Sequence, residues 1–305
     1  MKALIIGVGG FVGPYLENEL VENEYEVYGC GYIPDDMKNY INYYETDITN
    51  YEEVYKIFDE TKPDVIFNLA AVSSVGLSWK KPQLTINVNV IGTINILEAT
   101  SKVCPNARIL LIGSSEEYAP SDKPVSEESE LNPVNPYGIS RITIEEFAKI
   151  YRLEYKLNIT CIRAFNHTGL GQTPTFVLPS FVNQIAQITK SGKSGVIRVG
   201  NLEAYRDFSD VRDIVRAYRL IAECSEELKV VNVGSGKAHQ VKELLEYIVS
   251  LSNQQITIEL DSERFRPADL PYCCCKNTLL KESTGWKPEY EIYSTLKEMY
   301  NDALK

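Results

Sequence analysis

The chain has 305 residues, of which 44% are hydrophobic and 24% are charged, and its formal net charge is −11. This composition is typical of a folded globular protein with one large domain or two unequal lobes. Because 42 acidic residues outnumber 31 scattered basic ones, the chain is a poor candidate for binding nucleic acid or an anionic membrane.

The first half of the chain alternates short apolar strands with helices, a pattern that predicts a parallel sheet covered on both faces. Strands are predicted at Ala3–Ile6, Tyr25–Tyr28, Val65–Leu69, Arg108–Gly113 and Ile159–Arg163, and helices at Phe11–Leu20, Thr85–Thr100 and Ser140–Tyr155. The expected fold is therefore α/β, with a doubly wound, Rossmann-type parallel sheet.

The rhythm changes after Asn166, where a loop rich in Gly, Pro and Thr begins. Helices are predicted at Pro179–Thr189, Ser209–Glu223 and Val241–Ser250, a strand at Val196–Val199, and an irregular stretch at Pro267–Tyr272. We expect residues 1–165 to form the Rossmann domain and residues 166–305 to form mainly a smaller α/β lobe. Part of the range 205–240 is expected to return to the first domain.

The seven cysteines and the absence of long apolar segments bear on where the protein works. The number of cysteines is odd and most stand alone, so no disulfide framework is predicted. The run Cys273–Cys275 has no second ligand pair at zinc-like spacing, so no metal site is predicted either. With no secretory signal and no segment long enough to span a membrane, the expected location is the cytoplasm.

A glycine-rich turn follows the first strand. Gly7, Gly10 and Gly13 have the spacing GxxGxxG, with Phe11 and Val12 between the last two. Without Cβ atoms the backbone can approach a pyrophosphate, whose charge is favoured at the N-terminus of the next helix. Because the turn lies between a strand and a helix, it predicts dinucleotide binding rather than a purely structural turn.

The end of the second strand leaves the choice between NAD and NADP open. An acidic residue there binds the ribose 2′-hydroxyl, whereas a basic one accommodates a 2′-phosphate. The sequence has Cys30-Gly31-Tyr32, which is neither, and Asp35 and Asp36 come late.

Further motifs extend along most of the chain. They are Asp47-Ile48, Asn68-Leu69-Ala70-Ala71, Asn89 with Gly92-Thr93, Ser114-Ser115 and Tyr137-x-x-x-Arg141. With the glycine turn, they resemble the extended short-chain dehydrogenase/reductase family of nucleotide-sugar enzymes. The resemblance implies that Asp47 and Ile48 contact the adenine and that Leu69, Ala70 and Ala71 pass behind the cofactor. Asn68 stands where the family often has His.

The resemblance also implies four catalytic residues, Ser114, Tyr137, Arg141 and Glu116, of which Tyr137 and Arg141 would also contact the cofactor. Ser114 matches the family's catalytic Ser/Thr, the alternative being that Ser114 and Ser115 cap a loop. Tyr137 would be the proton donor, the alternative being a surface residue at a helix start. A phenol titrates near pH 10, so it needs a nearby cation, and the family supplies a Lys one helical turn later. Here that residue is Arg141, which is permanently charged and can still favour tyrosinate, although its fork is wider than an ammonium.

Residues from both halves of the chain are expected to bind the substrate. Arg206 and Arg266 suit a diphosphate, because guanidinium groups bind phosphate oxygens in pairs, and Asp269 suits a ribose hydroxyl. The full set of candidate substrate-binding residues is Ser74, Ser115, Glu116, Asn166, Asn201, Arg206, Arg266 and Asp269.

Within the family, the segments around Asn166 and Arg206 resemble those of enzymes that act on GDP-mannose-type sugars. This resemblance implies NAD(P)H-dependent reduction of the C4 keto group of a GDP-4-keto-6-deoxyhexose. An alternative is a GDP-mannose 4,6-dehydratase or another nucleotide-sugar epimerase or dehydratase, with Glu116 abstracting the C5 proton. A third is a non-catalytic module that binds the dinucleotide and a GDP-sugar, favoured only by Arg141. We also expect a homodimer formed through the helices at Thr85–Thr100 and Ser140–Tyr155.

Overall fold

The computed structural model describes residues 1–32, 42–264 and 270–305. Its largest sheet has seven strands, and each pairs with its neighbours in parallel. In spatial order they are β10 (Val230–Val233), β6 (Asn158–Ala164), β5 (Arg108–Ile112), β4 (Val65–Asn68), β1 (Lys2–Ile6), β2 (Glu26–Gly31) and β3 (Asn42–Glu45). The strand order reverses between β1 and β4, and in such sheets ligands bind there, beyond the carboxyl ends of the strands.

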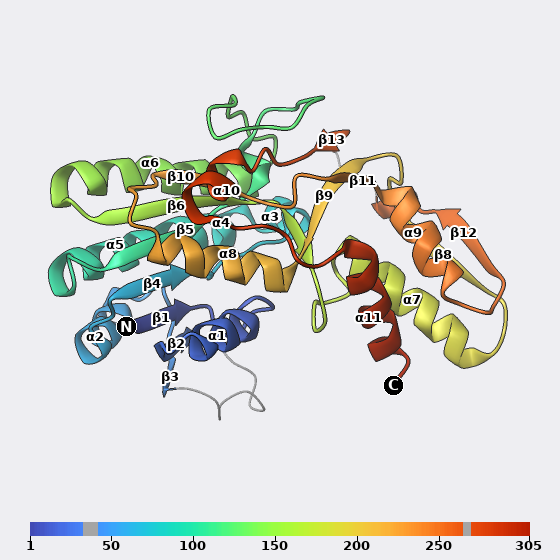
Figure 1. Ribbon diagram of the computed structural model, residues 1–305, viewed down its shortest axis with the longest axis horizontal. Coiled ribbons are helices and arrows are strands. Elements are labelled where there is room, and N and C mark those ends of the chain that lie inside the picture. The colour runs from blue at the N-terminus through green and yellow to red at the C-terminus, as the bar shows by residue number, and fades with distance from the viewer. Residues whose placement is uncertain (33–41, 265–269) are drawn as a thin grey trace.

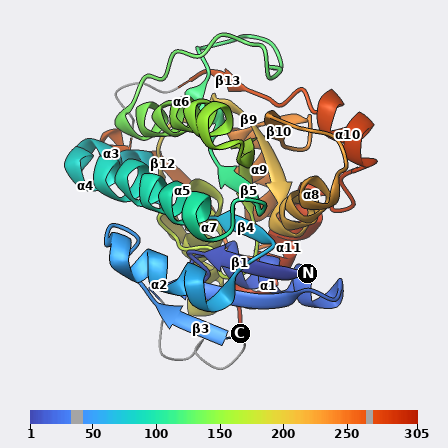
Figure 2. The same ribbon diagram turned by 90° about the vertical axis from the view of Figure 1, so that its left-hand side faces the viewer.

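Helices cover both faces of this sheet (Figures 1 and 2). One face carries α1 (Gly13–Glu22), α8 (Val211–Glu223) and α10 (Thr278–Thr284), and the other carries α2 (Tyr51–Thr61), α5 (Gly92–Val103) and α6 (Pro136–Tyr155). Each layer has its own buried apolar core, around Leu16 and Ile214 on the first face and around Ile57 and Ile144 on the second. The predicted Rossmann-type α/β fold is confirmed.

The second lobe lies beyond the carboxyl ends of the strands, on the right in Figure 1. Its core joins α7 (Val177–Ser191), α9 (Val241–Ser250) and α11 (Ile292–Ala303) through side chains such as Phe181, Leu244 and Leu296. Its short strands are β7 (Asn166–Thr168), β8 (Gly195–Val199), β9 (Tyr205–Asp210), β11 (Ala238–Gln240), β12 (Ile256–Leu260) and β13 (Tyr272–Cys273).

The chain passes between the two lobes more than once. Strand β10 follows α8 and pairs with β6 of the large sheet, although β9 just before α8 lies in the small one. The domain boundary expected near residue 165 therefore marks only the first passage of the chain from the Rossmann domain to the second lobe. The division into two domains stays a prediction.

The helix predicted at Thr85–Thr100 is interrupted. It consists of α4 (Pro82–Ile86), a π-helical turn labelled η2 (Asn87–Ile91) and α5. The wide turn places the buried side chain of Asn89 where its Nδ2 donates to Ser140 Oγ at 2.9 Å and its Oδ1 accepts from the Val72 amide at 2.8 Å. π turns of this kind occur mostly as single insertions in α-helices.

Two other helices begin later than predicted. The first helix begins at Gly13 and not at Phe11, because Phe11 and Val12 still belong to the glycine turn. Helix α8 begins at Val211 and not at Ser209, because Asp210 caps it by accepting the Arg212 amide at 2.8 Å.

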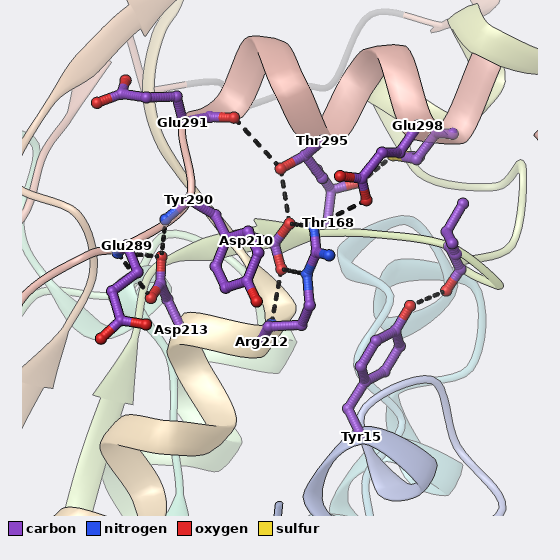
Figure 3. Close-up of polar contacts among 12 residues, drawn as sticks. Tyr15, Thr168, Asp210, Arg212, Asp213, Glu289, Tyr290, Glu291, Thr295 and Glu298 are labelled. Atoms are coloured by element: carbon purple, nitrogen blue, oxygen red, sulfur yellow. Dashed lines mark hydrogen bonds and ion pairs between the residues drawn. The ribbon is translucent and has the colours of Figure 1, made fainter. Parts of the chain in front are cut away.

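A polar junction at the start of α8 joins the two lobes (Figure 3). Buried Asp210 accepts from Thr295 Oγ1 of α11 at 2.6 Å, and Arg212 donates to Glu298 Oε2 of the same helix at 2.9 Å. Buried Asp213 accepts the backbone amides of Glu289 and Tyr290 that lead into α11. The junction therefore anchors the second lobe on a helix of the Rossmann domain.

Candidate active site

The glycine turn has the geometry of a dinucleotide site. Gly7 has φ +84°, and a Cβ there would lie 2.8 Å from the backbone of Ala70. At Gly13 a Cβ would lie 1.8 Å from the carbonyl oxygen of Val8. Both glycines are thus required for the strand, turn and helix to pack closely. The resulting cradle at the N-terminus of α1 fits a pyrophosphate.

The remaining predicted cofactor residues follow strands β4 and β3 of the large sheet. Leu69, Ala70 and Ala71 follow β4 and are partly exposed. Asp47 is exposed, and its Oδ1 accepts from the Thr49 amide and hydroxyl at 2.9 and 2.7 Å. Ile48 is buried and packs against Gly92. Adenine contacts through Asp47 and Ile48 stay a prediction.

Ser114 and Tyr137 are brought together by the packing of a helix on a turn. Ser114 follows β5 and caps the 3₁₀ turn η3 (Ser115–Glu117), while Tyr137 lies in the first turn of α6. At Gly138, a Cβ would be only 2.3 Å from the carbonyl oxygen of Glu116. The first turn of α6 therefore rests directly on the turn that carries Ser114, at the carboxyl edge of the sheet.

Arg141 is buried beside Tyr137. Its guanidinium carbon lies 5.0 Å from the centre of the Tyr137 ring, and its side chain is only 4% exposed. Within the described part of the chain, its Nε has no hydrogen-bond partner. A buried guanidinium with a free donor is expected to bind an acceptor, and the ribose hydroxyls of a bound dinucleotide would suit it.

Glu116 is fixed by a residue that precedes Tyr137. Its Oε2 accepts from Asn135 Nδ2 at 2.8 Å, and Asn135 Oδ1 in turn caps α6 by accepting the Gly138 amide at 2.9 Å. The carboxylate is thereby held at the start of the helix that carries the phenol. This arrangement suits a proton acceptor at the substrate.

Phe11 reaches the second lobe. Its ring stacks on that of His167 in β7, with 6.2 Å between centroids and 10° between planes. Burial lowers the pKa of His167. Asn166, a predicted substrate residue, is the neighbour of this histidine and is partly exposed.

Two predicted substrate residues, Arg206 and Ser115, lie near each other around Cys273. Arg206 is partly exposed and donates to the Tyr205 carbonyl at 2.8 Å. Its register partner in β13 is Cys273. Burial raises the pKa of the Cys273 thiol to about 12, despite a hydrogen bond from Ser115. Ser115 and Arg206 therefore face the same region around Cys273.

The other predicted residues lie farther apart or cannot be placed. Asn201 is partly exposed and accepts the Glu203 amide at 3.0 Å, and Ser74 caps α3 (Val75–Lys80). Arg266, Asp269, Asp35 and Asp36 lie outside the described residues.

Sequence reasoning missed Asn135 and Cys273. Asn135 could have been found, because an Asn directly before Pro136 is a standard helix-start signal. Cys273 had no such signal, since its position beside Ser115 depends on pairing between β13 and β9. Among residues 1–32, 42–264 and 270–305, no group of three His, Cys, Asp or Glu side chains could hold a metal ion.

Comparisons with known proteins agree with this geometry. Residues 4–299 match the family described as GDP-mannose 4,6 dehydratase. The chain belongs to this family. The resemblance to the extended short-chain dehydrogenase/reductases is thus confirmed, and the protein is an NAD(P)-dependent nucleotide-sugar oxidoreductase of that type. No helix in the described ranges is long and apolar enough to cross a membrane.

Individual relatives cover the whole chain. It is 28% identical to a GDP-6-deoxy-D-mannose reductase of Pseudomonas aeruginosa, over 99% of this chain and 96% of the relative. It is 30% identical to a GDP-6-deoxy-D-talose 4-dehydrogenase of Aggregatibacter actinomycetemcomitans, over 100% and 98%. A solved structure of RMD from Pseudomonas aeruginosa complexed with NADPH superposes with a TM-score of 0.88 and 27% identity, covering 100% of this chain and 99% of that one.

Proposed function

We propose that this member of the GDP-mannose 4,6 dehydratase family reduces the C4 keto group of a GDP-4-keto-6-deoxyhexose, giving a product of the GDP-D-rhamnose type. The observation that carries the proposal is the contact of the first turn of α6 with the turn after β5, because it assembles Ser114, Tyr137 and Arg141 in one place. The two relatives named for GDP-6-deoxyhexoses support the substrate class.

In this proposal the side chains protonate and stabilise the oxygen of the C4 carbonyl group. Bound NADPH or NADH supplies the hydride for C4. The Tyr137 hydroxyl donates its proton to the carbonyl oxygen, and the Ser114 hydroxyl stabilises that oxygen as its charge develops. The Arg141 cation stabilises the tyrosinate left on Tyr137. Addition of one hydride and one proton accounts for the alcohol.

The nucleotide and sugar would be held by residues of both lobes. Arg206 and Arg266 would bind the diphosphate oxygens and Asp269 a ribose hydroxyl. Ser74, Ser115, Asn166 and Asn201 would donate hydrogen bonds to the remaining groups. The preference for guanine rests on the names of the relatives.

Glu116 favours a second candidate, 4,6-dehydration of GDP-mannose. Its carboxylate is held by Asn135 at the start of α6, where it could remove the C5 proton. A dehydratase restores its own cofactor in each cycle and therefore consumes none, which separates the two activities in an assay.

The test is the near-ultraviolet absorbance of the reduced nicotinamide. Purified protein is mixed with NADPH or NADH and with GDP-4-keto-6-deoxymannose, which a separate dehydratase forms in situ from GDP-mannose. We expect a substrate-dependent fall in absorbance, and the faster coenzyme identifies the natural one. Conversion of GDP-mannose alone to a 4-keto product, without that fall, would move the assignment to the dehydratase.

A substitution tests how far Arg141 limits turnover. Arg141→Lys should raise kcat sharply if the wide guanidinium limits the enzyme, and an unchanged kcat would show that it does not. Arg152→Lys on the same helix is the matched control, because Arg152 donates only to groups of the fold, including the Ile159 and Lys229 carbonyls.

We further propose a homodimer through α5 and α6. The outer face of α6 exposes Ile139, Ile150 and Leu153, the last with 74% of its surface accessible. The double substitution Ile150→Glu, Leu153→Glu should yield monomers in sedimentation. Leu260→Glu, at an equally exposed apolar residue of β12, is the control that should not. An unchanged sedimentation profile of the double variant would refute this interface.

A further inference from the structure

Three buried charged side chains lie beneath Ser114 and take no part in the steps above. Glu117 of η3 is 0% exposed, and Glu145 of α6 and Arg163 of β6 are 4% exposed each. Charges this deep are costly unless they are paired and hydrogen-bonded. The hydrogen bonds that these three side chains make therefore indicate how many protons the two carboxyl groups share.

Arg163 donates its hydrogen bonds to groups other than Glu117. It binds Glu145 in bidentate fashion, with Nε to Oε1 at 2.8 Å and Nη2 to Oε2 at 2.7 Å. Its Nη1 donates to the Tyr118 hydroxyl at 3.0 Å and to the Glu127 carbonyl at 2.9 Å. The Arg163–Glu145 pair is therefore neutral without any contribution from Glu117.

The two carboxyl oxygens of Glu117 have different surroundings. Oε1 accepts the Ser114 amide at 2.7 Å. Oε2 receives no hydrogen bond from the described residues and lies 3.7 Å from Arg163 Nε, whose proton is directed at Glu145. The Glu145 carboxyl lies within hydrogen-bonding reach of Glu117, and a bond between the two needs a proton on one of them. Two carboxyl groups in contact, with one guanidinium between them, are satisfied only if they hold one proton.

We propose that Glu117 is a positioning residue that works in its neutral form, donating a proton from Oε2 to Glu145 while Oε1 accepts the Ser114 amide. The resulting chain of hydrogen bonds runs from Ser114 through Glu117 and Glu145 to Arg163. It ties the turn that presents Ser114 to the helix that carries Tyr137. The inference rests on the proposed function, since it takes Ser114 as a group that contacts the substrate.

Gly113 shows that the fold makes room for this carboxyl. A Cβ at Gly113 would lie 2.5 Å from Glu117 Oε1 and 2.9 Å from the carbonyl oxygen of Ile162. No residue with a side chain fits there without displacing the carboxyl from the Ser114 amide.

The neutral form has a consequence for pH. Burial, followed by the charge of Glu145, raises the pKa of Glu117 well above its ordinary value. The titratable and charged groups that face Glu117 are Glu145 of α6 and Arg163 and Cys161 of β6. Its chain neighbours have other partners, since Glu116 binds Asn135 and the Tyr118 hydroxyl accepts from Arg163. Above the raised pKa the cluster acquires a net negative charge next to Ser114, so activity should fall on the alkaline side.

The test compares Glu117→Gln with Glu117→Leu. The amide of Gln can donate to Glu145 and accept from Ser114 as a neutral carboxyl does, whereas Leu can do neither. We expect Glu117→Leu to lower kcat about tenfold or more with little change in KM, a loss of about 1.4 kcal/mol in the transition state. Glu117→Gln should retain most of kcat and should lose the alkaline fall that comes from Glu117. Glu128→Gln, an exposed position in the next loop, is the control and should match the wild type.

A second readout requires no turnover. The infrared carbonyl band of a buried protonated carboxyl should be present in the wild type and in Glu128→Gln and absent in Glu117→Gln. If the protein reduces no sugar but shows this band, the proposed function fails and the protonated Glu117 stands. If the band is absent, or if Glu117→Gln loses as much kcat as Glu117→Leu while it unfolds at the wild-type temperature, Glu117 acts as a carboxylate and the inference is wrong.

Discussion

Asp213→Ala should weaken the protein at the junction between its lobes. The Asp213 carboxylate is 1% exposed and accepts three hydrogen bonds that cross the junction or brace it: the amides of Glu289 and Tyr290 at 2.9 to 3.0 Å, and Arg216 Nη2 at 2.5 Å. Removing the carboxylate leaves two amides and a guanidinium without their buried acceptor. Losses of about 1.5–3 kcal/mol for each charge-assisted hydrogen bond, partly offset by water, suggest a total of about 3–5 kcal/mol.

Thermal unfolding measures this loss. At roughly 2 °C per kcal/mol for a chain of this size, Tm should fall by about 6–10 °C. Glu298→Ala is the matched control, because it removes a junction ion pair whose acidic partner is 46% exposed, and such pairs contribute about 0–1 kcal/mol. Equal effects of Asp213→Ala and Glu298→Ala on Tm would refute the argument that burial makes Asp213 the critical contact.

Three further predictions concern single residues. The fully buried Tyr218 hydroxyl finds no partner among the described residues, so Tyr218→Phe should stabilise the protein by about 1 kcal/mol in urea unfolding; a loss of stability would reveal a bond to the hydroxyl. Gly7→Ala should abolish NADPH binding in a fluorescence titration because of the positive φ and the contact with the loop after β4, and binding at the wild-type affinity would contradict the proposed cradle. Burial lowers the folded-state pKa of His167 below 6.5, so the unfolded chain binds the proton first and stability should fall as pH drops below about 6.5. His167→Gln should remove part of this fall in a Tm series; a pH dependence equal to that of the wild type would argue against it.

The sequence predicted five of the seven strands of the large sheet and the cofactor turn, because their signals are local, whereas β3 and β10 were not among the predicted strands. An apolar run that ends at Gly7 and is followed by an amphipathic helix is typical of the first strand, turn and helix of a Rossmann fold. The small strands of the second lobe were mostly missed. β7 and β11 have only three residues each and form by pairing with β9, so no periodicity within them reveals their partners.

The candidate site was predictable in its motifs but not in its supporting contacts. Ser114, Tyr137 and Arg141 were found because their positions resemble the catalytic motifs of the extended short-chain dehydrogenase/reductase family. Glu116 and Glu117 look alike as two adjacent acidic residues, yet one binds Asn135 at the start of α6 and the other is buried completely. The difference arises from the docking of α6 on the turn after β5, which no local pattern encodes.

The return of β10 to the large sheet limits how this protein can be divided. β6 is buried along most of its length and would become an outer strand if the chain ended at residue 165. Its free backbone groups and apolar side chains would then be available to another copy, which is the usual route to edge-to-edge aggregation. The N-terminal fragment alone should therefore precipitate on expression. A fusion protein that uses its dinucleotide site must also contain β10.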